Sequence, residues 1–266
     1  MPEHMLFSLS AVVALVPSSL LPLRRGHSRD GLFWAVLLVA VAGPAAWVLA
    51  STHGAWRTDF AMTLWITVAA TMAAFVVVAV VSREAWRLTP LITAYMAALA
   101  ALATVWDQAP EKPLGAVAAG GWIGIHIVVS VATYALVTIA AVAALAAFLQ
   151  ERALKRKQPT ALTHLLPSVA DCEGLLVPLL VIGEAVLALG LVTGMALQFG
   201  ETGTVLVFDH KTVLTITAFA VIGGLLFAHF RTGLRGRKAA RIVLLAYLLL
   251  TLGYPGVKFV TDVILA

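Results

Sequence analysis

The chain has 266 residues, of which 61% are hydrophobic and only 12% are charged, and its formal net charge is +5. A soluble domain has about 25% charged residues, so this composition excludes a soluble globular protein and predicts a protein embedded in a lipid bilayer. The positive charge does not indicate nucleic-acid binding, because membrane proteins concentrate Lys and Arg in their cytoplasmic loops.

Eight apolar stretches are long enough to cross a bilayer as helices, which requires about 20 residues each. None has the alternating pattern of membrane-barrel strands, so we predict an all-α, polytopic membrane protein with a single transmembrane domain over residues 1–266. The first stretch, Met5 to Leu23, has no basic region before it and no small-residue cleavage pattern after it, and we expect a retained span and not a signal peptide. The predicted spans are about 5–23, 32–51, 61–81, 89–106, 119–149, 175–198, 212–230 and 242–264.

Basic residues predict the orientation of these helices. Fourteen of the 18 Lys and Arg residues fall in or beside the loops after the first, third, fifth and seventh spans. Since cytoplasmic loops attract Lys and Arg, both termini are expected outside. The longest loop is predicted over about 150–174, on the cytoplasmic side. The fourteen residues are Arg24, Arg25, Arg29, Arg83, Arg87, Arg152, Lys155, Arg156, Lys157, Arg231, Arg235, Arg237, Lys238 and Arg241.

The fifth span contains a histidine, His126, a turn or two below the predicted outer surface. Trp122 lies four residues earlier and therefore on the same helical face, and Tyr134 lies two turns deeper on roughly that face. Neutral imidazole is a good ligand for iron, and an aromatic-lined slot suits a flat porphyrin. Alternatively, the histidine donates a hydrogen bond to a neighbouring carbonyl and has a structural role.

The seventh span carries polar residues at both ends. At its outer start, Asp209, His210 and Lys211 gather where the helix dipole favours an acid or a bound anion. Asp209 is also a candidate N-cap, and Lys211 is a candidate partner for a haem propionate or another carboxylate. At the cytoplasmic end, His229 either binds a metal or extends to the interface beside Arg231.

A lone carboxyl group, Glu184, falls near the middle of the sixth span. An acid at that depth is either protonated or paired. It is thus a candidate proton or cation site, a partner for an imidazole, or a neutral acid bonded to a neighbouring helix. One side of this helix carries three glycines, Gly183, Gly190 and Gly194, and so has no side chains at these positions. This allows close helix packing or leaves room for a ligand. The single cysteine excludes a disulfide and a CxxC redox pair.

Several segments resemble the CcsA-type cytochrome c assembly family, in particular its YpjD/HemX-like branch of eight-helix inner-membrane proteins. They are "GIHIVVSVATYAL", "ALAAFLQERALKRK", "VIGEAVLALGLVTGMA", "FDHKTVLTITAF" and "HFRTGLRGRKAARI". The resemblance covers about residues 115–264, whereas the first four spans match in number and spacing only. It implies a location in the bacterial inner membrane.

The resemblance also implies that haem is held by histidines, without a covalent bond to the protein (b-type). His126 matches an outer-side histidine of the family, and His229 matches one deeper in the membrane. The tryptophan-rich outer motif of the haem-delivering members is missing, because "FGETGTVLVFDHKT" contains no tryptophan and only Asp209 and Lys211 keep its DxK spacing. The family's second outer histidine, expected after the last helix, has no counterpart before Ala266, which leaves His210 as the candidate substitute.

Two functions follow from these residues. The first is a haem-binding inner-membrane protein that handles haem or takes part in cytochrome c assembly. It would act by coordination and transfer of haem, and it would be neither a synthase nor another enzyme. The second is a membrane accessory or transport subunit with structural histidines, Glu184 as its proton or cation coupling group, and another inner-membrane protein bound at its basic loops.

Overall fold

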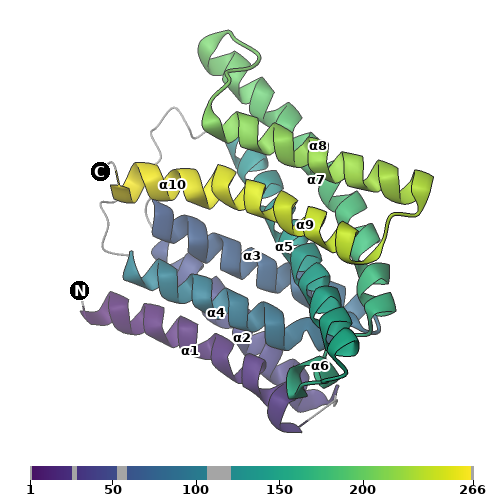
Figure 1. Ribbon diagram of the computed structural model, residues 1–266. Helices are drawn as coiled ribbons and strands as arrows, with labels where there is room; N and C mark the ends of the chain where they lie inside the picture. Colours follow the sequence, from purple (N-terminus) through teal and green to yellow (C-terminus); the bar gives the residue numbers. More distant parts are fainter. Residues whose placement is uncertain (1, 26–28, 53–58, 107–120, 265–266) are drawn as a thin grey trace.

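The computed structural model describes residues 2–25, 29–52, 59–106 and 121–264 (Figure 1). These residues form helices and short connections, with no strand among them. The fold is therefore all-α, as predicted. The helices are α1 (Pro2–Arg25), α2 (Gly31–Ser51), α3 (Phe60–Val81), α4 (Thr89–Val105), α5 (Gly121–Arg156), α6 (Ala161–Leu165), α7 (Val169–Thr202), α8 (His210–Thr232), α9 (Gly236–Thr251) and α10 (Val257–Phe259).

Eight helical segments in the described part of the chain are long and apolar enough to cross a membrane. They correspond one to one with the eight predicted spans. The fourth includes a 3₁₀ turn, Ala85–Leu88, before α4, and the eighth combines α9 with a π-helical turn, Leu252–Gly256, and α10. Helix α5 continues past the fifth predicted span, 119–149, to Arg156.

Side-chain caps determine where several helices begin. Asp30 and Asp59 accept hydrogen bonds from the third residue of α2 and of α3, at 2.9 Å each, which satisfies backbone N–H groups that have no partner within the helix. Ser168 and Asp171 form a reciprocal capping box at the start of α7. This box explains why α7 begins six residues before the predicted span.

The start of α9 also differs from the prediction, because the helix begins at Gly236 instead of residue 242. The segment "GRKAAR" is too polar to be recognised as part of an apolar span. A carboxylate oxygen of Glu173 on α7 accepts a hydrogen bond from the Gly236 backbone N–H at 2.8 Å. This contact supplies the partner that the first turn of the helix needs.

The prediction of a long loop over 150–174 is wrong, because helices occupy most of that range. Only short connections flank α6, and side chains from other helices hold them in place. The Gln150 side-chain amide donates to the carbonyls of Thr163 and Pro167 at 2.8 and 3.0 Å, and the Arg87 guanidinium donates to the Leu165 carbonyl at 3.1 Å.

The central element is α5, which contacts α3 and α4 on one side and α7 and α9 on the other. In its second half, most of the buried positions are alanines and valines. Small residues let helix backbones approach closely in a bilayer, so this half is tightly enclosed. The half around His126 is more open.

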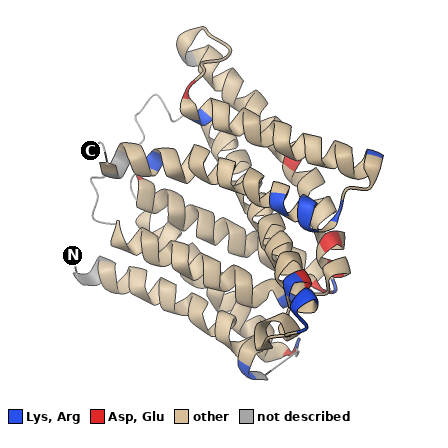
Figure 2. Ribbon diagram, viewed as in Figure 1, with Lys and Arg blue, Asp and Glu red and all other residues tan. Residues whose placement is uncertain are grey.

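Both ends of the chain lie at one end of the bundle (Figure 1). The basic residues gather mainly at the opposite end, around α6, the last turn of α5 and the first turn of α9 (Figure 2). This asymmetry agrees with the charge pattern from which an outer location of both termini was predicted. The orientation itself stays a prediction, and the terms "outer" and "cytoplasmic" are used here in that sense.

Candidate functional site

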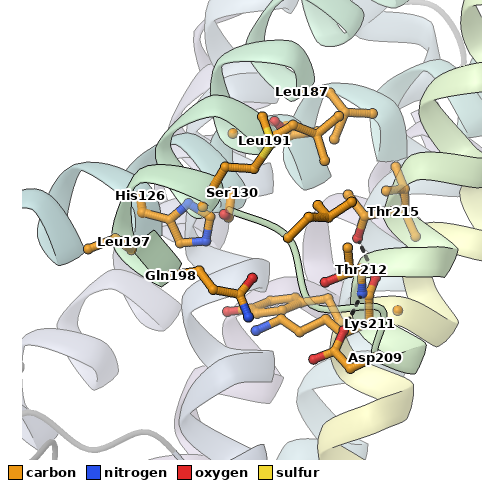
Figure 3. A pocket seen from close by; sticks show the side chains of 18 of the residues that line it. His126, Ser130, Leu187, Leu191, Leu197, Gln198, Asp209, Lys211, Thr212 and Thr215 are labelled. Carbon is orange, nitrogen blue, oxygen red and sulfur yellow. Dashed lines mark hydrogen bonds between the residues drawn. The ribbon is translucent and has the colours of Figure 1, made fainter. Parts of the chain in front are cut away.

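A cavity of about 420 Å³ lies between four helices in the outer half of the bundle. The first half of α5, the second half of α7, the first turns of α8 and the end of α9 form its walls (Figure 3). Its volume is within the range of cofactor and small-molecule sites, roughly 300–1,000 Å³. Leucines from α7 and α9 line its inner part, among them Leu187, Leu191 and Leu250, and polar groups lie at its rim.

His126 lies in the wall of this cavity, with its ring facing the space between α5 and α7 (Figure 3). The ring is half-buried. Its Nδ1 atom lies 3.0 Å from the hydroxyl oxygen of Thr193 on α7. With Nδ1 engaged in this way, Nε2 is the ring nitrogen that can bind a metal.

The imidazole fits against α7 because residue 194 is a glycine. A Cβ atom at Gly194 would lie 3.1 Å from Cε1 of His126, which is closer than an ordinary van der Waals contact. One turn earlier, a Cβ at Gly190 would lie 3.5 Å from a methyl group of Val129. The glycine face of α7 thus packs closely against α5 at Gly190 and leaves room for the His126 ring at Gly194.

Asp209 and Lys211, at the start of α8, lie at the rim of the cavity (Figure 3). The Asp209 carboxylate accepts a hydrogen bond from the Thr212 backbone N–H at 2.7 Å, which confirms it as the N-cap. Burial alone would raise the pKa of Asp209, but the bonds from Thr212 and the positive charges of Lys211 and His210 hold that pKa below its ordinary value. Lys211 is exposed and lines the rim, whereas His210 is exposed and is not among the lining residues.

Tyr134 forms part of the cavity wall, and its hydroxyl is engaged in a buried network. That hydroxyl lies 3.1 Å from the hydroxyls of Tyr247 and Thr251 on α9. Tyr247 is in turn hydrogen-bonded to Tyr95 on α4. Tyr134 therefore contributes its ring to the cavity and links the wall to two other helices.

Trp122 does not line the cavity, and its side chain is 63% exposed. It lies one turn nearer the start of α5 than His126. The four-residue spacing places Trp122 and His126 on the same face of α5, but only His126 lines the cavity. A role for Trp122 in binding stays a prediction.

His229 lies at the other end of α8, far along the helix from the cavity that holds His126. Its Nδ1 atom lies 3.0 Å from the Leu234 backbone carbonyl, and its ring packs edge-on against Phe230. The cavity beside it has a volume of about 20 Å³, which is enough for about one water molecule. A flat macrocycle does not fit there in this arrangement, and haem ligation by His229 stays a prediction.

Glu184 does not line the cavity either. Its carboxyl group faces α8, where a Cβ at Gly223 would lie 3.0 Å from Oε1. Both carboxyl oxygens are buried, and neither has a hydrogen-bond partner among the described residues. The structure thus places this acid between two helices and not beside His126.

Several residues of the site were not recognised from the sequence. Thr193 is a small residue in an apolar span, and its local sequence carries no sign of a contact with His126. Gly253 and Tyr254 line the cavity from the π-helical turn that contains Pro255. A proline inside a predicted span was the available signal, because it disturbs regular helical bonding, and π-helical turns occur often at functional sites.

Comparison with known proteins gives one family. The family model described as "Cytochrome C assembly protein" matches residues 31–265. The chain is 54% identical to a protein of Azospirillum brasilense described as "Uncharacterized 28.8 kDa protein in nifR3-like 5'region", over all of both chains. It is 27% identical to "Inner membrane protein YpjD" of Escherichia coli K12, over 99% of this chain and 100% of the relative.

Proposed function

The chain belongs to the cytochrome c assembly protein family and is a multi-pass protein of the bacterial inner membrane, and on this premise we propose that it binds haem in the outer cavity, with His126 as the iron ligand. The observation that carries the proposal is the imidazole in the wall of a cavity of about 420 Å³. The family is associated with haem handling and cytochrome c maturation. The proposal assigns that role to particular residues.

The nitrogen donor and the apolar residues of the cavity wall suit haem. His126 supplies a nitrogen ligand of the type that holds haem iron in many proteins. The inner walls are apolar, with Leu187, Leu191 and Leu250, and so suit the hydrophobic face of a porphyrin. Gly194 leaves the space in which the imidazole sits.

The rim suits the charged edge of the same molecule. Haem carries two propionate groups, and Lys211 presents an ammonium group where they would reach the outer surface. The Asp209 carboxylate is occupied as a helix cap, and Lys211 forms no ion pair within the described part of the chain. Its ammonium group can therefore act as a point charge for a propionate. His210 is not among the residues that line the cavity, and its role as a second outer ligand stays a prediction.

The proposed activity is binding and transfer without a catalysed reaction. Bound haem would supply an iron centre whose coordination the protein controls through His126. The chain's own residues hold the ligand nitrogen, exclude water from the inner wall and compensate the propionate charge. The tryptophan-free "FGETGTVLVFDHKT" segment supports a role in handling haem and not in the synthesis of cytochrome c.

A haem titration of the purified apoprotein in detergent tests this function. We expect saturable binding with a Soret band in the wild type and loss of that band in His126→Ala. His164→Ala is the matched control, because His164 is exposed on α6 at the other end of the bundle, and it should bind as the wild type does. Equal binding by His126→Ala and the wild type would overturn the proposal.

A second candidate function rests on Glu184. A buried carboxyl group that has no hydrogen-bond partner in the described part of the chain is the kind of intramembrane acid that carries protons or cations in transport proteins. If the protein is a transport subunit, Glu184→Gln should abolish a proton or cation flux into proteoliposomes. If it binds haem as proposed, the same variant should leave the haem titration unchanged, because Glu184 lies outside the cavity.

A further inference from the structure

The Thr193 hydroxyl has three neighbours that together restrict how its single proton is used. Its oxygen lies 3.0 Å from the Leu189 carbonyl, 3.1 Å from the Gly190 carbonyl and 3.0 Å from Nδ1 of His126. Thr193 is 4% exposed. A threonine hydroxyl has one proton to donate and can accept at its oxygen lone pairs.

The two carbonyl oxygens can only accept. A threonine within a helix usually donates its proton to the carbonyl three or four residues earlier, and both of those carbonyls are within reach here. Once the proton is used in this way, the contact with His126 requires the imidazole to donate. Nδ1 then carries the ring proton, and Nε2 carries a lone pair.

The opposite tautomer is less favourable at this site. It would turn the Thr193 proton away from both helix carbonyls and place an N–H group at Nε2. The ring faces the cavity (Figure 3). Because the Thr193 proton is directed to the helix carbonyls, the network favours the form with the ring proton on Nδ1.

We infer that Thr193 is a positioning residue that fixes the tautomer of His126 and aims the Nε2 lone pair into the cavity. The ligand role of that lone pair rests on the proposed function, whereas the tautomer does not. Thr193 and Gly194 act together, because the first binds the ring and the second leaves room for it. Partners of this kind orient metal-binding histidines, and their loss typically lowers metal affinity by about 10–100-fold.

Substitutions at position 193 separate the hydroxyl from the shape of the side chain. Thr193→Val keeps the volume and removes the acceptor, whereas Thr193→Ser keeps the acceptor. Thr217→Val is the matched control, because the Thr217 hydroxyl also donates to a carbonyl of its own helix, that of Val213 at 2.7 Å, and is exposed away from the cavity.

The first measurement is nitrogen NMR of the haem-free protein labelled at histidine, with the His126 signal identified by its loss in His126→Ala. We expect a protonated Nδ1 and an unprotonated Nε2 in the wild type, in Thr193→Ser and in Thr217→Val, and a shifted tautomer population in Thr193→Val. A protonated Nε2 in the wild type, or an unchanged tautomer in Thr193→Val, would overturn the inference.

The second measurement is the haem titration of the same four proteins. Thr193→Val should bind about 10–100-fold more weakly than the wild type, and Thr193→Ser should recover most of that loss. Wild-type affinity in Thr193→Val would overturn the positioning role. The absence of binding in the wild type, together with the expected NMR result, would instead contradict the proposed function and leave the tautomer assignment intact.

Discussion

The α-carbon of Gly194 and the imidazole of His126 are in such close contact that a Cβ atom at position 194 would lie 3.1 Å from Cε1. The histidine can face the cavity only because α7 presents no side chain at this point. The contact joins two helices, α5 and α7, that are separated along the chain by α6 and its connections. It makes position 194 a sensitive test of the site.

Gly194→Val should displace the His126 ring and weaken haem binding strongly, because a branched side chain would overlap the imidazole. Gly200→Val is the control on the same helix, since nothing lies within 4 Å of a Cβ at Gly200. Haem titration of both variants measures the effect. If Gly194→Val bound haem as well as Gly200→Val, the packing of His126 against α7 would have no part in binding.

Lys211→Gln should weaken haem binding a few-fold at low ionic strength, with a smaller loss at high salt, because an exposed charge is screened. The loss should be absent for haem dimethyl ester, whose propionates carry no charge. Lys238→Gln is the control, because Lys238 is exposed at the other end of the bundle. Equal losses for haem and for its ester would show that Lys211 does not bind a propionate.

Asp209→Ala should lower the free energy of unfolding by about 1 kcal/mol, through loss of the N-cap of α8. Asp209→Asn should retain most of this free energy, because asparagine is also a favourable N-cap residue. The folded-state pKa of Asp209 is below its ordinary value, so the ionised cap contributes its full stability above the unfolded-state pKa. That contribution is lost as the pH falls through the folded-state pKa.

Thermal unfolding in detergent between about pH 7 and about pH 3 measures this dependence. The wild type should lose stability at the acid end by more than Asp209→Asn does, because only the wild type has a carboxylate to protonate at this position. Parallel pH profiles for the two proteins would contradict the assignment of the charge to the cap.

Tyr247→Phe should destabilise the bundle by more than Tyr95→Phe. The Tyr247 hydroxyl lies within hydrogen-bond distance of both Tyr95 and Tyr134 and so joins α4 to α5 through α9. Hydrogen bonds between membrane helices contribute about 0.6 kcal/mol each on average, so the expected losses are small but distinguishable by thermal unfolding. A larger loss for Tyr95→Phe would show that Tyr247 is not the centre of the network.

The sequence was sufficient to predict the eight spans, because each is a long apolar stretch and the bilayer sets the length. It also placed His126 and Asp209 near the same end of the bundle, since both lie at the outer ends of their spans. The N-cap role of Asp209 could be predicted because capping is local. The single acid in the predicted span 175–198, Glu184, was visible as an exception to the apolar pattern.

Features that depend on contacts between distant segments could not be predicted. The cavity is lined by residues from four helices that meet only in the folded chain. The pairing of His126 with Thr193 requires a known register between α5 and α7. The helices within 150–174 were missed because their stability comes from caps and from Gln150 contacts rather than from apolar length. The spacing that puts Trp122 on the helical face of His126 could not show that Trp122 is exposed and lies outside the cavity lining.

The most direct test of the central claim is an experimental structure of the haem-reconstituted protein in detergent or lipid nanodiscs. We predict haem density in the cavity between α5, α7, α8 and α9, with the iron bound to Nε2 of His126 and a propionate near Lys211. Haem bound elsewhere, for instance at His229, or an iron with no contact to His126, would contradict the claim.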